Sequence, residues 1–384
     1  EDDSSLDGLK LTTYLFPDHI LGRGECLMSL PRLSVDTRLI YHNTVAIVEV
    51  CQRAGLQVFG VTKGAGGLPA VARAMLAGGV VGIADSRLIN LEWLKKSGIG
   101  APLMLLRSPM KGEIHRAVAV ADIILCSTLS TIQALSKAAV EERREIEVIP
   151  MVEMGDRREG LMPELVGDLV ASGGKLPGIR IRGLGTNLAC FAGALPTPAS
   201  TTFLENMAQS LGSGRASEFV LSAGNSSALG LVYQEEWPQL SFPAHLRVGE
   251  SILLGWDVIT KEPLPETSQA AFRFYAEVIE VAKKPSLPGG PTGCNAFDEY
   301  WEPLDRGTHW RAVLALGRQD LGAGSIIPID PGIEVIGMTS DHTILAVDQA
   351  ENKIVVGSEL EFRLDYGGLL AAMTSPYVGK IIKE

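Results

Sequence analysis

A lysine at the end of an apolar run is the residue best placed for covalent chemistry in this sequence. Lys63 follows the run at residues 56–61 after one threonine, and the glycine-rich stretch 64–67 comes directly after it. A strand that ends in such a turn can hold an amine at the mouth of a barrel, where burial favours the nucleophilic form. A solvated lysine at a strand end is the alternative.

Small residues at the ends of two later runs indicate an anion site. Gly224, Asn225 and Ser226 follow one run, while Gly249 follows another run that carries Arg247. Barrel enzymes bind phosphate at the loops after their last two strands, where backbone N–H groups can approach an anion. With the lysine, this favours pyridoxal phosphate held as a Schiff base. A helix cap at Ser226 and a structural ion pair at Arg247 are the alternatives.

The elements that must position these groups alternate regularly. A helical pattern at 37–54 is followed by eight continuous apolar runs, most of them succeeded by a helical pattern. This predicts an α/β fold, a parallel (β/α)₈ TIM-like barrel, with a doubly wound open sheet as the alternative. The runs cover residues 56–61, 80–84, 102–106, 121–126, 146–152, 179–185, 218–223 and 245–249. The helical patterns between them cover 69–77, 87–97, 130–142, 161–171 and 200–211.

The sequence pattern changes after about residue 255, where helical patterns become rare and β-rich runs follow one another. We therefore expect a pyridoxal-phosphate-binding barrel domain at 32–255, beginning with a strand at 32–35, and a mostly β domain at 256–384. Residues 1–31 fit neither domain. Within them, the first 27 residues are either an added leader or a native packing arm. The β-rich runs cover residues 275–281, 312–316, 333–337, 343–347, 353–356 and 360–364.

Composition excludes several classes of partner. The formal net charge of -11 argues against nucleic acid and anionic membranes, because no basic stripe accompanies it. The five cysteines are scattered, which suits reduced thiols in the cytoplasm better than a disulfide framework. The acidic start differs from a signal peptide, and no uncharged stretch is long enough to span a membrane. No two histidines stand at metal-ligand spacing, so we expect no metal site.

The same segments carry a family resemblance that runs in order from residue 33 to the C-terminus. The chain resembles the alanine racemase fold, type III of the pyridoxal-phosphate enzymes, and most closely its ornithine/lysine racemase branch. The segments are VTKGAGG (61–67), GIADSRLINL (82–91), MVEMGDRREG (151–160), GLGTNLAC (183–190), SAGNSSAL (222–229), LRVGESILLG (246–255), LALGRQD (314–320), GMTSDHTIL (337–345) and LDYGGLLAAMTSPYV (364–378).

This resemblance implies roles for the residues around the cofactor ring. Lys63 forms the internal aldimine and acts as one catalytic base. Arg247 donates to the pyridine nitrogen and keeps it unprotonated, which favours racemisation over transamination or decarboxylation. Arg158 interacts with the phenolic oxygen and the substrate, although a solvated salt-bridge loop is equally consistent with its neighbours. Asn187 stands where alanine racemases have a histidine beside the ring.

The resemblance also implies a phosphate site. Ser226 with Asn225, Gly249 and the backbone N–H of Glu250 holds the phosphate, and Tyr377 reaches it from the C-terminal domain.

One departure from the family concerns the second base. Two-base racemisation needs a proton donor on the opposite face, which the family takes from the partner subunit of a homodimer with shared active sites. The tyrosine that serves there is missing, because the matching stretch places Phe297 where a proton-transfer group is needed. The candidates for this role are Cys294, Asp298, Tyr300, Asp341 and His342.

The leading functional hypothesis is a racemase of ornithine, lysine or another basic amino acid; the runner-up is an alanine or broad-specificity racemase. Basic amino-acid decarboxylases share the fold, but they place an acid at the pyridine nitrogen, where this chain has Arg247. Cofactor-carrier proteins consist of the barrel alone. A distal substrate ammonium needs a carboxylate partner. The candidate acids are Asp156, Glu159, Asp298 and Asp341.

Overall fold

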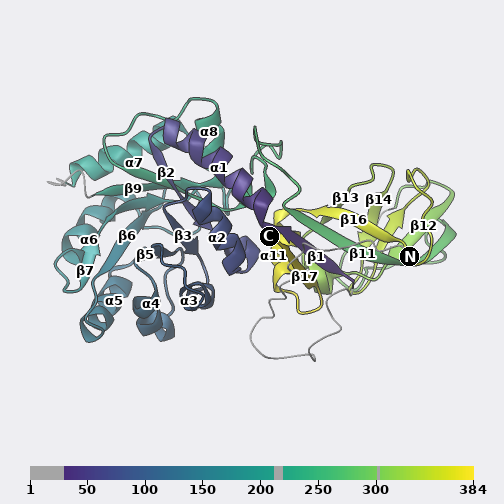
Figure 1. Ribbon diagram of the computed structural model, residues 1–384, viewed down its shortest axis with the longest axis horizontal. Coiled ribbons are helices and arrows are strands. Elements are labelled where there is room, and N and C mark those ends of the chain that lie inside the picture. The colour runs from purple at the N-terminus through teal and green to yellow at the C-terminus, as the bar shows by residue number, and fades with distance from the viewer. Residues whose placement is uncertain (1–29, 212–218, 301–302) are drawn as a thin grey trace, which may run out of the picture. The chain divides into compact units, whose positions relative to one another are not determined.

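The computed structural model describes residues 30–211, 219–300 and 303–384, which divide into two compact units (Figure 1). The barrel unit comprises Thr37–Gln269. The β unit combines the segment that ends at Asp36 with Ala270–Glu384.

The barrel unit is a closed ring of eight parallel strands, which confirms the predicted fold. The ring runs in the order β2, β3, β4, β5, β6, β8, β9 and β10, and it closes through pairing of β10 with β2. Figure 1 shows helices on the outside of these strands. The ring strands are β2 (Leu56–Val61), β3 (Gly82–Asp85), β4 (Leu103–Leu105), β5 (Ile123–Cys126), β6 (Ile146–Val152), β8 (Gly183–Thr186), β9 (Val220–Asn225) and β10 (Ala244–Val248).

Alternating strand residues fill the barrel interior with apolar side chains. One buried cluster draws on β2 through β6 and contains Phe59, Ala84, Met104, Leu125 and Ile149. A ring of parallel strands covered by helices buries both faces of each strand, which is why these strands read as continuous apolar runs. The helices are α1 (Thr37–Arg53), α2 (Pro69–Ala77), α3 (Leu88–Lys96), α4 (Ile114–Val120), α5 (Leu129–Glu141), α6 (Val166–Gly173), α7 (Pro198–Ser210), α8 (Leu229–Tyr233) and α9 (Glu250–Leu254).

Two expected elements of the barrel differ in detail. The run at 179–185 is two strands, because β7 (Ile179–Ile181) pairs with the start of β6 whereas β8 pairs with its end and with β9. The helical pattern at 161–171 begins later, at Val166, because Leu161 forms a bridge with Val152 and Pro163 opens a 3₁₀ turn.

The described residues of the β unit form a mostly antiparallel sheet and two helices. Its main strand path is β13, β16, β11, β12, β15 and β14, and its longest strand, β11, pairs with both β12 and β16. The expected mostly β character is confirmed. The elements are β11 (Phe272–Pro285), β12 (Thr308–Leu314), α10 (Arg318–Leu321), β13 (Ile326–Pro328), β14 (Glu334–Met338), β15 (Thr343–Ala346), β16 (Glu359–Leu364), α11 (Tyr366–Thr374) and β17 (Gly379–Lys383).

The strand expected to open the barrel domain belongs to the β unit instead. β1 (Arg32–Asp36) pairs antiparallel with β11 and parallel with β17, so the barrel unit begins at Thr37 rather than at residue 32 and extends to Gln269 rather than 255. A strand whose partners come from the end of the chain cannot be assigned from local pattern. The question about residues 1–27 lies outside the described residues.

The expected strand at 353–356 is wrong. Val355 and Val356 are exposed, and Gly357 adopts a φ of +88° while its N–H donates to the carbonyl of Val278. The segment is therefore a turn that leads into β16.

Candidate active site

The predicted barrel residues lie at the carboxyl ends of strands that are neighbours in the ring. Arg158 follows β6, Asn187 follows β8, Asn225 ends β9, Arg247 lies on β10 and Lys63 follows β2. β6, β8, β9, β10 and β2 are consecutive neighbours, and Arg247 pairs in register with both Asn225 and Phe59. The fold therefore brings these five residues to one end of the barrel, which is the end where barrel enzymes carry their active sites.

Lys63 begins a tight turn that we call the Lys63 turn (residues 62–67). The carbonyl of Thr62 accepts the N–H groups of Ala65 at 2.8 Å and Gly67 at 3.2 Å, so the chain folds back directly after the strand. Gly67 has a φ of +70°, and a Cβ there would lie 2.5 Å from Cβ of Asn90. Lys63 itself is half-buried, whereas the residues that follow it in the turn are buried. The turn thus presents one amine on a rigid base.

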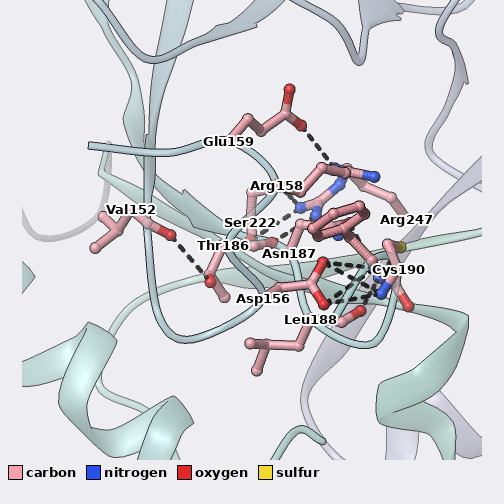
Figure 2. A network of polar contacts seen from close by, with 12 residues as sticks. Val152, Asp156, Arg158, Glu159, Thr186, Asn187, Leu188, Cys190, Ser222 and Arg247 are labelled. Atoms are coloured by element: carbon pink, nitrogen blue, oxygen red, sulfur yellow. Dashed lines mark hydrogen bonds and ion pairs between the residues drawn. The ribbon is translucent and has the colours of Figure 1, made fainter. Parts of the chain in front are cut away.

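Arg247 is 4% exposed, and its guanidinium is held by two neighbouring strands (Figure 2). Its Nη2 donates to the carbonyl of Thr186 at 2.6 Å, and its Nη1 donates to the carbonyl of Ser222 at 2.9 Å and to the hydroxyl of Ser222. Burial, aided by the charge of Arg158, lowers the pKa of Arg247 to about 10. The group therefore remains a cation at neutral pH, in a fixed orientation.

The predicted phosphate-binding residues form a compact cluster at the ends of β9 and β10. The Ser226 hydroxyl accepts the N–H of Gly249 at 3.2 Å, which joins the two loops. A Cβ at Gly249 would lie 2.9 Å from Cβ of Val61, so this loop also packs against the strand that leads to Lys63. The Glu250 carboxylate binds Trp256 and Lys261, which leaves only its backbone for the predicted role. Glu250 opens α9, where helical N–H groups lack partners within the helix.

Asn225 connects this cluster to the loop after β8. Its Nδ2 donates to Oδ1 of Asn187 at 3.0 Å and to the carbonyl of Leu188 at 2.8 Å, while its Oδ1 accepts the N–H of Ser227. Within the described part of the chain, the buried Nδ2 of Asn187 has no hydrogen-bond partner. A buried donor without a partner is costly, and such donors occur where a ligand supplies the acceptor.

Arg158 lies on a loop held by a neighbouring aspartate. We call residues 153–160 the Arg158 loop and residues 187–194 the Asn187 loop. Asp156 is 2% exposed, and its carboxylate accepts the backbone N–H groups of Cys190, Phe191 and Ala192 at 3.1–3.2 Å. Figure 2 shows this carboxylate against the Asn187 loop, with Glu159 reaching Arg158 at 2.6 Å. Asp156 is thus committed to backbone groups and is no candidate for a substrate ammonium.

A histidine lies on β10 two residues before Arg247. His245 is buried and packs against Phe59, with ring centroids 4.8 Å apart and ring planes inclined by 56°. Burial, with the nearby charges of Arg247 and Arg182, lowers the pKa of His245 to about 3. The imidazole is therefore neutral under ordinary conditions.

The β-unit candidates all lie on exposed segments. Cys294, Asp298, Tyr300, Asp341 and His342 are exposed, and Tyr377 is 66% exposed between α11 and β17. Phe297, which occupies the position of the missing tyrosine, packs its ring under the Arg318 guanidinium at 4.0 Å. Arg318 also binds Glu299 at 2.8 Å, so this segment has a defined conformation.

Sequence reasoning missed three buried polar residues of the barrel. Thr186 and Ser222 orient Arg247, and Asp85 binds Thr62, the residue before Lys63. Each interrupts or ends an apolar strand, and that was the available signal, because a polar residue in a buried strand needs a partner. The residues that the structure describes contain no group of three His, Cys, Asp or Glu side chains that could hold a metal. Within the same residues, no helix combines the length and apolarity needed to cross a membrane.

Comparison with known proteins agrees with the fold. Residues 35–253 match the family model of the alanine racemase N-terminal domain. The chain is 36% identical to the lysine racemase of Thermotoga maritima over 92% of this chain and 99% of that protein. It is 34% identical to the ornithine racemase of Acetoanaerobium sticklandii, with 91% and 99% covered. An alanine racemase structure from Bartonella henselae with covalently bound pyridoxal phosphate superposes with a TM-score of 0.68 at 15% identity, covering 92% of this chain and 99% of that chain.

Proposed function

This chain belongs to the alanine racemase family of pyridoxal-phosphate enzymes, and we propose that it interconverts the L and D forms of ornithine, lysine or a similar basic amino acid. The observation that carries the proposal is the convergence of Lys63, Arg247 and Asn187 at the ends of neighbouring strands. The two full-length relatives named above support a basic substrate. An alanine or broad-specificity racemase is the alternative.

The barrel residues fit pyridoxal phosphate. The unpartnered Nδ2 of Asn187 and the fixed Arg247 cation suit a heteroaromatic ring that carries hydrogen-bond acceptors, while Ser226, Gly249 and the start of α9 would hold its phosphate. When bound, this cofactor links to an amine through its aldehyde and withdraws electrons from the substrate Cα, which makes the Cα proton easier to remove.

The protein's own contribution is to hold and move that proton. Lys63 would take or return the proton on one face of Cα, and its tight turn keeps the amine at one position. Arg247 would limit electron withdrawal, because a cation with a pKa of about 10 does not give a proton to a weakly basic ring nitrogen. This restraint favours proton return over decarboxylation.

A second subunit completes the proposal. Racemisation needs a proton donor on the other face of Cα, and we propose that a β-unit residue of the partner in a homodimer supplies it. Cys294, Asp298, Tyr300, Asp341 and His342 are exposed and therefore available to a partner. An active species that sediments as a monomer at assay concentration would contradict this.

The four described cysteines form no disulfide, which supports a cytoplasmic setting.

Glu159 is the barrel acid that best fits a distal substrate ammonium. Asp156 is committed to backbone N–H groups, whereas Glu159 is half-buried and, among the described residues, its carboxylate binds Arg158. If Arg158 turns to the substrate carboxylate or to the cofactor, the carboxylate of Glu159 becomes free to bind an ammonium group.

The first test concerns Lys63. Lys63→Ala should remove both the near-visible absorbance band of the bound cofactor and the activity, because no other amine replaces it at the end of β2. Lys63→Arg, the control, keeps the positive charge and should restore neither. Wild-type turnover by Lys63→Ala without added amine would refute the assignment.

The second test concerns the substrate. Cα deuterium exchange across a panel of amino acids should be most efficient with ornithine or lysine. Glu159→Gln should weaken the binding of both by about 2 kcal/mol or more, which is measured as a rise in KM. Glu164→Gln, on an exposed 3₁₀ turn of the same unit, is the matched control and should change neither KM. Equal or better efficiency with alanine in the wild type would favour the alternative.

A further inference from the structure

A fully buried aspartate lies beside the Lys63 turn and takes no part in the site described so far. Asp85 ends β3, the ring neighbour of β2, and is 0% exposed. Its Oδ2 accepts the hydroxyl of Thr62 at 2.9 Å, and its Oδ1 accepts the backbone N–H of Arg87 at 2.8 Å and Nδ2 of Asn90 at 3.1 Å. The carboxylate is therefore bound by groups on both sides of the β2–β3 boundary.

These contacts fasten both ends of the Lys63 turn. Thr62 is itself 0% exposed, and besides its hydroxyl contact it donates its N–H to Ala84 and accepts two N–H groups of the turn. At the other end, the backbone of Gly67 packs directly on Asn90, the second side chain that Asp85 binds. A local turn around Asp85 would explain the contact with Arg87. It does not explain the contact with Thr62 or the burial of the acid.

The charge of Asp85 is coupled to Lys63. Burial raises the pKa of the Asp85 carboxyl, and the hydrogen bonds from Arg87, Thr62 and Asn90 oppose that rise, as does the positive charge of Lys63. Lys63 is thus a charged side chain that acts on this carboxyl, and a negative charge on Asp85 and a positive charge on Lys63 attract each other.

We propose that Asp85 is a positioning residue for Lys63, which it holds through Thr62 and Asn90 and attracts by its charge. The inference rests on the proposed role of Lys63 as the cofactor-bearing amine. It separates into a mechanical part, carried by the hydrogen bonds, and an electrostatic part, carried by the charge.

Two near-isosteric variants separate these parts. Asp85→Asn keeps the shape and can keep all three contacts, because the Thr62 hydroxyl can turn to accept from the new amide. It removes the charge and reverses the direction of the Thr62 contact. Thr62→Val keeps the charge and the shape but removes the contact that joins the acid to the turn. Asp122→Asn is the control. Asp122 also accepts one backbone N–H, from Leu103 at 2.9 Å, and one arginine, Arg144 at 3.2 Å, but it lies just before β5, at the amino end of the barrel.

The variants are measured as cofactor-loaded protein, by the pH dependence of the bound-cofactor absorbance band and of kcat, with thermal unfolding alongside. Asp85→Asn should move the pH midpoint of the band and the kcat profile downward by about half a unit or more, because it removes an anion near the amine. Thr62→Val should lower kcat about tenfold with the pH profile unmoved. Asp122→Asn should change neither readout, whatever it does to stability.

The proposal fails if Asp85→Asn and Thr62→Val keep wild-type kcat and pH profiles, whether or not they lose stability. If Asp85→Asn does not fold, Thr62→Val alone decides the mechanical part, and wild-type kcat in that variant overturns the proposal. A wild-type protein that binds no cofactor or racemises nothing is a failure of the proposed function and is seen before any variant is made.

Discussion

The Lys63 turn and the Arg158 loop each depend on one buried aspartate, and the two aspartates bind their partners differently. Asp85 binds mainly side chains, those of Thr62 and Asn90, and secures a turn of only six residues. Asp156 binds backbone N–H groups of three consecutive residues and joins two longer loops. Side-chain contacts depend on the identity of each neighbour, whereas backbone contacts depend only on the path of the chain.

This difference matches what each segment must do. Lys63 must deliver one atom to one position, and a short turn with side-chain contacts gives little freedom. The Arg158 loop carries Glu159, the acid proposed to bind the substrate ammonium. Its backbone anchor allows the residues around Asp156 to change while the loop stays in place. On this view the chemistry is located in the first segment and the choice of substrate in the second.

The largest effect should come from crowding the Lys63 turn. Gly67→Ala should destabilise the protein by about 3 kcal/mol, since it combines a positive φ with a close contact to Asn90. It should also abolish racemisation. Gly55→Ala is the control, because Gly55 has a φ of +74° with nothing within 4 Å, and it should cost only about 1 kcal/mol with activity kept. Urea unfolding and initial rates measure both. Equal effects of the two variants would contradict the tight packing of the turn.

A smaller effect should follow from releasing the Arg158 loop. Asp156→Ala removes the side-chain acceptor of three N–H groups of the Asn187 loop, of which that of Ala192 keeps the Asp156 carbonyl, and we expect kcat/KM to fall about 10- to 100-fold. Because the Lys63 turn has its own anchor, the absorbance of bound cofactor should persist. Asp168→Ala, at an exposed position of α6, serves as control. Loss of the cofactor band in Asp156→Ala would show that the two segments are not independent.

Part of the fold and part of the site could be predicted from the sequence. The barrel strands and the residues at their ends could be predicted, because strand pairing in a parallel ring places all carboxyl ends at one mouth. Lys63, Asn225 and Arg247 were found in this way. The assignment of β1 to the β unit could not be predicted, because its partners lie about 240 and 350 residues further along the chain, and local pattern carries no pairing information.

The two aspartates show where residue-level prediction stops. Asp156 lies in a loop expected near the barrel mouth, so it was one of four candidate acids for the substrate ammonium, yet the backbone N–H groups of the Asn187 loop bind its carboxylate. Asp85 lies in the segment 82–91, but no role was predicted for it. Its side-chain partners are five and 23 residues away, and only the fold makes them neighbours. A buried polar residue can be suspected from sequence, whereas its partner depends on tertiary structure.

The smallest predicted effect concerns the barrel interior, which supports both the Lys63 turn and the Arg158 loop. His245 lies in the barrel interior below Arg247, and burial lowers its pKa to about 3, from an ordinary value near 6.5. Between these pH values the unfolded chain binds a proton that the folded chain does not. The contribution of His245 to the free energy of unfolding is therefore complete above about pH 6.5 and is lost as the pH falls toward 3. At pH 5 the loss from this residue is about 2 kcal/mol. His245→Leu should remove it, while changing the free energy of unfolding little at pH 7.5, since Nε2 of His245 has no partner among the described residues.

Urea unfolding of both proteins at pH 7.5 and pH 5 measures this difference, and hydrogen exchange locates it. If the histidine supports the barrel as a whole, acid should weaken protection in the Lys63 turn and the Arg158 loop alike, and His245→Leu should restore both. Because β10 pairs with β2 and with β9, an interior residue of β10 has no reason to favour one segment. If acid reduces protection from exchange in the Lys63 turn alone, His245 would instead support that turn, together with Asp85. The Lys63 turn would then depend on two buried residues rather than one.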